Sequence, residues 1–369
     1  MASTSPNPSN EYETVRLAAR AELPDERAEA LRRVTSGPLD WGEVLRLGSY
    51  HKLLPLLHAH LREHADPPES VTALLLNRAR RTSANVLFLS SEMARIARQF
   101  DRDGIRFLVL KGPSLSEAYG NLANRPFVDN DLWVQREDFD RVEATLLGLG
   151  FNERKLSDRQ QSGYLSVHGE YTFGRSVGAF GSTVDVHTRL VHVGYTYAPD
   201  FDRLLARSRP ILVAGQEVPA LSWEDLFLAL SVNALKDQWD RIRLASDLAA
   251  VAEQVEDWGV VLDTAARGHV LRTVHLAVLL ATDIAGGAFP DPVLQQARRD
   301  ARAVRLSAFV QRTLAAGNVD EPLSGWERAK FNMVVQDGLR GQVRYSAYAA
   351  VRRATERWVR PYAERPAHA

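Results

Sequence analysis

The pattern of apolar and polar positions changes twice along the chain. Up to about residue 100, apolar residues recur at helical spacing, as in 43-EVLRLGSYHKLLPLLHAHL-61 and 70-SVTALLLNRARRTSANVLFLSSEMARIARQF-100, and no strand pattern appears. Pro55 is expected to kink or break the first of these segments. From Ser222 to about Trp358 amphipathic helical spacing returns. The sequence therefore predicts a helical region on each side of a different central segment.

The central segment alternates short apolar runs with helical stretches. The run 105-IRFLVL-110 predicts a buried strand that ends at Lys111-Gly112-Pro113. Residues 114–122 then predict a helix, with Ser114 as its N-cap and Glu117 completing a capping box. Further elements are expected in this order: a strand after Asp131, a helix at 136–150, and strands at 169–175 and 182–190. This order predicts an α+β fold with a small mixed sheet flanked by N- and C-terminal helical regions.

The changes in pattern also predict the limits of each part. We expect a disordered tail at 1–12, a helical region at 13–98, an α/β core at 99–215, a second helical region at 216–360 and a short tail at 361–369. The first residues, MASTSPNPSNEYE, lack the basic-then-apolar order of a signal peptide.

The amino-acid composition excludes several classes of function. The chain has 369 residues, 46 basic and 46 acidic, so its net charge is zero, which gives no sign of general nucleic-acid binding. It has no cysteine, which excludes disulfides, thiolate metal sites and cysteine nucleophiles. No apolar run approaches the roughly 20 residues that span a bilayer, so we expect no membrane partner and a cytoplasmic location.

Two carboxylates stand one residue apart in 125-RPFVDNDLWV-134. Asp129 and Asp131 flank Asn130 directly before an apolar run. In a strand, residues i and i+2 point to the same face, so these carboxylates would repel each other at short range. Solvent, a shared proton, a basic neighbour or a metal ion would have to offset that repulsion. A solvated strand end is the ordinary explanation, but the adjoining apolar strand favours a metal site.

A third carboxylate lies in 183-TVDVHTRL-190. Val184 and Val186 are expected to face the core, so Asp185 and His187 share the opposite face. A carboxylate on a strand within a sheet is costly unless it is paired. Three carboxylates converging across neighbouring strands would suit two divalent cations with oxygen ligands. His187 would then orient Asp185 or contact a nucleotide, although a structural role is equally expected.

The turn after the first predicted strand is a candidate phosphate site. Gly112 would let backbone amides approach a ligand, and a helix beginning near Ser114 would offer unpaired N–H groups. Many strand-to-helix turns carry glycine for geometric reasons alone, and that explanation is the commoner one.

Four stretches together carry a resemblance: 109-VLKG-112, 125-RPFVDNDLWV-134, 146-LLGLGF-151 and 184-VDVHTRL-190. Their order resembles the polymerase-beta-type nucleotidyltransferase superfamily, and more narrowly its bacterial uncharacterised nucleotidyltransferase family proteins. The flanking segments 40–57 and 222–249 are also similar, so the resemblance covers most of residues 40 to 250. Lys-Gly-Pro-Ser replaces the Gly-Ser dipeptide of the broad superfamily, which puts the triphosphate contact in question.

The resemblance implies transfer of a nucleoside monophosphate from a nucleoside triphosphate, with ATP the favoured donor, to a hydroxyl acceptor. It implies two Mg²⁺ ions, which Mn²⁺ can replace. The implied roles are these: Asp129 and Asp131 bridge the metals, Asp185 is the third carboxylate, Gly112 and Ser114 form the phosphate turn, and Arg125, Lys111 and His187 contact the nucleotide or its phosphates.

The sequence leaves the acceptor open among a small molecule, a protein and RNA. A first alternative function is a toxin-like nucleotidyltransferase that modifies tRNA or protein. A second is a non-catalytic module that only binds nucleotide. The intact Asp129, Asp131 and Asp185 argue against the last. Trp239 and Arg241 are candidates for lining a ligand pocket, but helix packing for the tryptophan and a surface ion pair for the arginine are the favoured interpretations.

Overall fold

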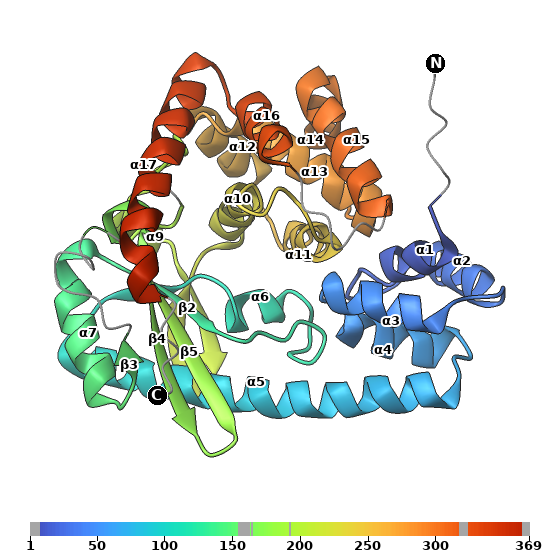
Figure 1. Cartoon of the computed structure of the whole chain (residues 1–369), viewed down its shortest axis with the longest axis horizontal. Coiled ribbons are helices and arrows are strands. Elements are labelled where there is room, and N and C mark those ends of the chain that lie inside the picture. Colours follow the sequence, from blue (N-terminus) through green and yellow to red (C-terminus); the bar gives the residue numbers. More distant parts are fainter. Residues whose placement is uncertain (1–7, 154–162, 164, 192, 317–323, 364–369) are drawn as a thin grey trace.

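The structure, a computed structural model, describes residues 8–153, 163, 165–191, 193–316 and 324–363. In the view of Figure 1 the sheet lies on the left and the N-terminal helices on the right, and a larger group of C-terminal helices lies above them. The predicted α+β fold, with a mixed sheet flanked by helical regions, is confirmed.

The described residues before the sheet are helical, as predicted. They form α1 (Asn10–Leu17), α2 (Asp25–Thr35), α3 (Trp41–Tyr50), α4 (Leu54–His64) and α5 (Glu69–Asp103). The predicted break at Pro55 separates α3 from α4, with the proline in the first turn of α4, where its missing N–H is not needed. Helix α1 starts within the predicted tail, because the Ser9 side chain caps it by accepting from the Tyr12 N–H. Residues 1–7 of that tail lie outside the described residues.

Helix α5 links the N-terminal helices to the sheet. Its 35 residues correspond to a length of about 52 Å, and it runs beneath both parts (Figure 1). Met93, Ile96 and Phe100, near its C-terminal end, belong to the hydrophobic core of the sheet. The helix ends at Gly104, which adopts the left-handed conformation. The boundary predicted between residues 98 and 99 therefore falls inside one continuous helix.

The described strands form one seven-stranded sheet in the order β3-β4-β5-β2-β1-β7-β6. They are β1 (Phe107–Val109), β2 (Asn130–Val134), β3 (Asn152–Glu153), β4 (Glu170–Val177), β5 (Phe180–His187), β6 (Arg209–Val213) and β7 (Gln216–Ala220). β2 pairs in parallel with β5 and antiparallel with β1, and β1 pairs in parallel with β7. The sheet is therefore mixed, as predicted.

The β6–β7 hairpin was not predicted, and it extends the sheet past the boundary expected at residue 215. Ala220, at the end of β7, pairs with Val109 of β1. Shorter helices connect the strands: α6 (Pro113–Glu117), the 3₁₀ helix η1 (Arg136–Asp138), α7 (Phe139–Gly148) and α9 (Phe201–Leu205).

The capping box predicted at Ser114 is wrong. Helix α6 begins at Pro113 and its N-cap is Gly112, without a side-chain hydrogen bond. The reason lies in Arg209 on β6. Its guanidinium donates to the Ser114 hydroxyl at 3.1 Å and pairs with the Glu117 carboxylate, so neither side chain caps the helix.

The two faces of the sheet pack against different helices. Leu132 and Val134 of β2 join α5 and α7 in one core, whereas Trp133 joins the core formed with the C-terminal helices. Asp131 has the same strand parity as Trp133. It therefore points to the face that the C-terminal helices cover.

The C-terminal part is helical to the end of the described residues. It comprises α10 (Trp223–Asn233), α11 (Ile242–Ala252), α12 (Trp258–Arg267), α13 (Leu271–Ala285), α14 (Asp291–Arg299), α15 (Ala301–Ala315), α16 (Gly325–Val335) and α17 (Leu339–Ala363). Thus α17 reaches into the tail predicted at 361–369, of which residues 364–369 lie outside the described residues. Among the described helices, none is both long and apolar enough to cross a membrane.

Candidate active site

Asp131 and Asp185 are direct neighbours on two parallel strands. The register of β2 and β5 pairs them, and neighbouring strands lie about 4.8 Å apart. Val184 and Val186 are fully buried on the other face, as the alternation predicted. Asn130 also points away, because its Nδ2 donates to the Leu89 carbonyl of α5 at 3.1 Å. The two carboxylates consequently face the same side of the sheet.

Asp129 lies one residue before β2, next to the turn at Gly112. Gly112 has φ +62° and ψ −116°, a combination that residues with a side chain avoid. A Cβ atom on Gly112 would lie 3.5 Å from the Asp129 carbonyl oxygen. That distance is an ordinary contact, so the backbone conformation, and not a lack of space, calls for glycine in the turn beside Asp129.

Two basic side chains offset the charge of Asp131. Lys111 Nζ lies 3.9 Å from Asp131 Oδ1, and His187 Nε2 lies 3.0 Å from the same oxygen. Burial alone would raise the pKa of Asp131, but Lys111 and the His187 hydrogen bond outweigh it and hold this pKa well below its usual range. Asp131 is thus ionised across the ordinary pH range.

For the other two carboxylates such compensation is incomplete. Burial raises the pKa of Asp129, and the charges of Asp131 and Asp185 raise it further. Burial also raises the pKa of Asp185, and repulsion from Asp131 adds to it, although the Thr172 hydroxyl, which donates to Asp185 Oδ1 at 2.6 Å, acts in the opposite direction. The site therefore favours an added positive charge.

His187 shares a face with Asp185, as predicted, but its hydrogen bond goes to Asp131. Its other ring nitrogen, Nδ1, lies 3.7 Å from Glu170 on β4, and Glu170 in turn lies 3.3 Å from Lys236 Nζ. Sequence reasoning missed Glu170. Strand alternation could have found it, since Glu170 and Thr172 share a parity and lie opposite His187 and Asp185.

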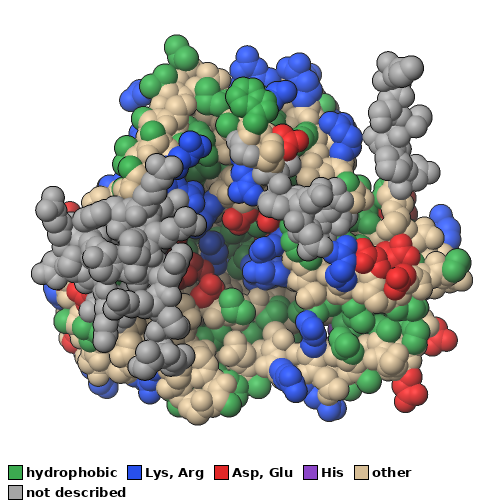
Figure 2. Space-filling view, viewed as in Figure 1, with side chains coloured by type: hydrophobic (Ala, Val, Ile, Leu, Met, Phe, Trp, Pro, Cys, Tyr) green, Lys and Arg blue, Asp and Glu red, His purple; other side chains and the backbone are tan. Residues whose placement is uncertain are grey.

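A pocket of about 400 Å³ opens in front of the carboxylates, within the size range of small-molecule sites. Its walls come from the sheet, from the start of the C-terminal helices and from the connection between α3 and α4. The predicted residues that line it are Lys111, Arg125, Asp129, Asp131, Asp185 and His187. Figure 2 shows acidic and basic side chains gathered around a hollow in the middle of this face.

Arg125 lines the pocket and is paired with a buried carboxylate. Its Nε and Nη2 donate to the two carboxylate oxygens of Asp247 on α11 at 2.5 and 2.8 Å, and Nη1 donates to the Pro126 carbonyl. Both partners are at most 7% exposed. The Tyr119 hydroxyl also donates to Asp247, at 2.8 Å. Arg125 therefore fixes the segment before Asp129 to the C-terminal helices, and its contact with phosphate stays a prediction.

The turn at residues 112–114, which was predicted to bind phosphate, is only partly accessible from the pocket. Ser114 is fully buried, bonded to Arg209, and is not among the residues that line the pocket. Gly112 is not among them either, and Pro113 has no N–H to donate. The expected contact of Ser114 with phosphate is thus replaced by a structural one.

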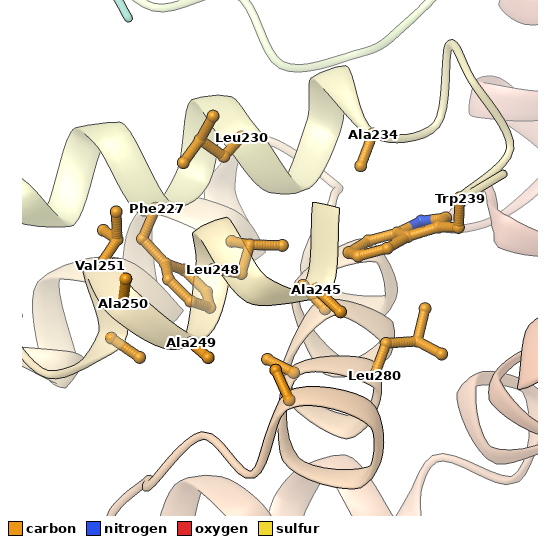
Figure 3. Close-up of a cluster of buried hydrophobic side chains, with 14 of the residues drawn as sticks. Phe227, Leu230, Ala234, Trp239, Ala245, Leu248, Ala249, Ala250, Val251 and Leu280 are labelled. Atoms are coloured by element: carbon orange, nitrogen blue, oxygen red, sulfur yellow. The ribbon is translucent and has the colours of Figure 1, made fainter. Parts of the chain in front are cut away.

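Trp239 and Arg241 have different surroundings in the structure. Trp239 is 1% exposed and packs among residues of α10, α11 and α13, including Ala234, Leu248 and Leu280 (Figure 3). The favoured interpretation, helix packing, is the observed one. Arg241 instead lines the pocket, with its Nε 3.9 Å from Asp240.

The donor set suits a hard cation such as Mg²⁺. Within the described parts of the chain, no three histidine or carboxylate side chains are close enough to hold a metal ion by themselves. Mg²⁺, however, needs only one or two carboxylates, because water and substrate phosphates supply its other ligands. The in-register pair Asp131 and Asp185, with Asp129 beside it, meets that requirement with oxygen donors only.

The fold and the site define an α+β protein with a carboxylate-lined pocket on one face of a mixed sheet. The family model described as "Uncharacterised nucleotidyltransferase" matches residues 37–286, well over half of the chain. The chain belongs to this family, and its general activity is nucleotidyl transfer. Comparisons with curated proteins and with solved structures each found no significant match.

Proposed function

We propose that the protein is a magnesium-dependent enzyme of the polymerase-beta type that transfers a nucleoside monophosphate from a nucleoside triphosphate to a hydroxyl group. The observation that carries the proposal is the in-register pair of Asp131 and Asp185, with Asp129 beside it, on one wall of the pocket. ATP is the donor we favour. The acceptor hydroxyl belongs to a small molecule, a protein or an RNA.

Asp129, Asp131 and Asp185 would hold two Mg²⁺ ions. When bound, Mg²⁺ would neutralise charge on the phosphates and on the leaving group. The raised pKa values of Asp129 and Asp185, caused first by burial and then by neighbouring carboxylates, support this assignment. Lys111 and His187 keep Asp131 ionised and fixed in place.

The reaction is an in-line displacement at the α-phosphorus. The acceptor oxygen forms a bond to that phosphorus as the bond to the pyrophosphate oxygen breaks, and pyrophosphate leaves. Asp185 accepts the proton of the acceptor hydroxyl. Thr172 orients it through the 2.6 Å hydrogen bond.

The test is transfer of label from α-³²P nucleoside triphosphates to small-molecule, protein and RNA fractions of a lysate, with Mg²⁺ or with a chelator. We expect labelled acceptor with Mg²⁺ only, confirmed as an added nucleoside monophosphate by mass spectrometry. Asp185→Asn should abolish transfer, whereas Asp202→Asn, which alters an exposed ion pair with Arg106, should not.

Label in the tRNA or protein fraction would support a toxin-like role. If the parent protein binds nucleotide but transfers it to no fraction, it is a binding module and the proposal is wrong. Unchanged transfer by Asp185→Asn would remove this residue from the mechanism.

A further inference from the structure

Basic and acidic side chains line the pocket in equal number, seven of each, but not every basic one is closely paired with a carboxylate. Lys52, Arg241 and Arg243 line it together with the three aspartates. Lys52 comes from the connection between α3 and α4, whereas Arg241 and Arg243 come from the start of α11. Two helical regions far apart in the sequence therefore direct cations into one pocket.

These three cations are poorly paired. Among the described residues, Lys52 has no ion pair or hydrogen bond from its side chain. Arg241 lies 3.9 Å from its nearest carboxylate, that of Asp240, and its buried Nε has no hydrogen bond to any described group. Arg243 lies 3.7 Å from Asp247, whose two oxygens already accept from Arg125.

The cations also act on one another. Partial burial lowers the pKa of Lys52, and the charges of Arg243 and Arg241 lower it further. Burial, followed by repulsion from Arg125, lowers the pKa of Arg243 to about 10. A group of mutually repelling cations is unfavourable in the free protein, and an anion bound among them would relieve the repulsion.

Backbone strain accompanies the same positions. Lys52 has φ +57°, and Gln238 and Trp239, shortly before Arg241, have φ +47° and +58°. Residues with side chains seldom adopt this left-handed conformation, and those that do are concentrated at functional sites. At Lys52 the left-handed backbone ends helix α3, since the Leu53 N–H donates to the Gly48 carbonyl, and glycine is the usual residue at such a position.

We propose that Lys52, Arg241 and Arg243 bind the phosphate chain of the nucleoside triphosphate. The identity of this ligand rests on the proposed function. The assignment adds cations to a site where the side chains of Ser114 and Arg125 are engaged by Arg209 and Asp247. It also gives the N-terminal helices a role, since they supply one of the three cations.

Binding can be measured without catalysis. Isothermal titration of inorganic tripolyphosphate and of ATP, both with a chelator present, would compare the parent with Lys52→Met and with Lys330→Met. Lys330 is an exposed residue of α16 outside the pocket lining, so its variant is the matched control. We expect Lys52→Met to weaken both ligands by roughly ten-fold or more and AMP by much less, while Lys330→Met leaves all three unchanged. Equal affinities of Lys52→Met and parent for tripolyphosphate and ATP would overturn the proposal.

A second variant separates binding from folding. Lys52→Gly removes the side chain and relieves the left-handed backbone, so its melting temperature should equal or exceed that of the parent while its affinity for tripolyphosphate falls. Retained affinity in this variant would likewise overturn the assignment. If tripolyphosphate binding depends on Lys52 but the parent transfers no nucleotide, the phosphate site stands and the proposed reaction fails.

Discussion

Replacing Asp131 and Asp185 by asparagine should change the stability of the folded protein in opposite directions. Each substitution removes one charge and almost no volume. Asp131 loses its attraction to Lys111 and His187, whereas Asp185 loses mainly the cost of burying its charge and, after that, its repulsion from Asp131. Repulsion between the aspartates by itself would predict that both variants gain stability. The paired environment of Asp131 changes that expectation.

The size of the effect follows from the contacts. Two unit charges 3.9 Å apart attract by about 4 kcal/mol at an effective dielectric constant of ~20. The Lys111 side chain is 33% exposed, so solvent screening reduces this to about 1–2 kcal/mol. Weakening the His187 hydrogen bond costs about 1 kcal/mol more. Asp131→Asn should therefore lose about 2–3 kcal/mol, while Asp185→Asn should be unchanged or gain up to about 1 kcal/mol.

The effects of the two substitutions on the free energy of unfolding should also depend on pH in different ways. The folded pKa of Asp131 is lowered, so its contribution is complete above the unfolded pKa of about 3.9 and is lost as the pH falls through the folded value. The folded pKa of Asp185 is raised, so its ionised form reduces stability at neutral pH. Any advantage of Asp185→Asn should disappear as acidification protonates the parent residue.

Urea unfolding of both variants at pH 7 and near pH 4, with a chelator present, would measure these differences. Asp202→Asn is the control, since its exposed ion pair with Arg106 contributes little. The reasoning is refuted if Asp131→Asn is at least as stable as the parent at pH 7, or if Asp185→Asn is the less stable of the two.

Two further predictions concern the supports of the site. Arg125→Met should lower the free energy of unfolding by about 3–5 kcal/mol, because Asp247 would stay buried without its bidentate partner; a loss below 1 kcal/mol in urea unfolding would contradict this. Gly112→Ala should cost about 1–3 kcal/mol through its left-handed backbone, whereas Gly148→Ala, in helix α7 with open space at its Cβ position, should gain up to about 1 kcal/mol. Equal melting temperatures for the two alanine variants would show that the Gly112 turn is not strained by a side chain.

The alternation of residues along strands made much of the site predictable. The two-residue period indicated that Asp129 and Asp131 point the same way and that Asp185 and His187 share the face away from the core, and the structure places all four at one pocket. The period cannot reveal which partners the facing helices supply. Arg125 pairs with Asp247, and Ser114 accepts a hydrogen bond from Arg209. Both contacts depend on tertiary packing, which no local sequence pattern encodes.

The missed hairpin has a local cause. β6 and β7 each contain a proline, and Pro210 and Pro219 lie opposite each other. Proline cannot donate a ladder hydrogen bond, so both segments lack the pattern of an ordinary strand. Lys52 was missed for a different reason: its contribution depends on a left-handed backbone at the end of a helix and on the docking of that helix beside α11.

The continuity of α5 limits how this protein can be divided for experiments. A fragment that begins at residue 99 would discard Met93 and Ile96, which are fully buried against the sheet. A fragment that ends at residue 98 would instead expose these same side chains to water, and each large apolar side chain contributes about 1.5–3 kcal/mol when buried. Neither fragment would therefore keep the structure that it has in the whole protein. Separately expressed fragments should aggregate, or should bind each other through the two parts of the divided helix.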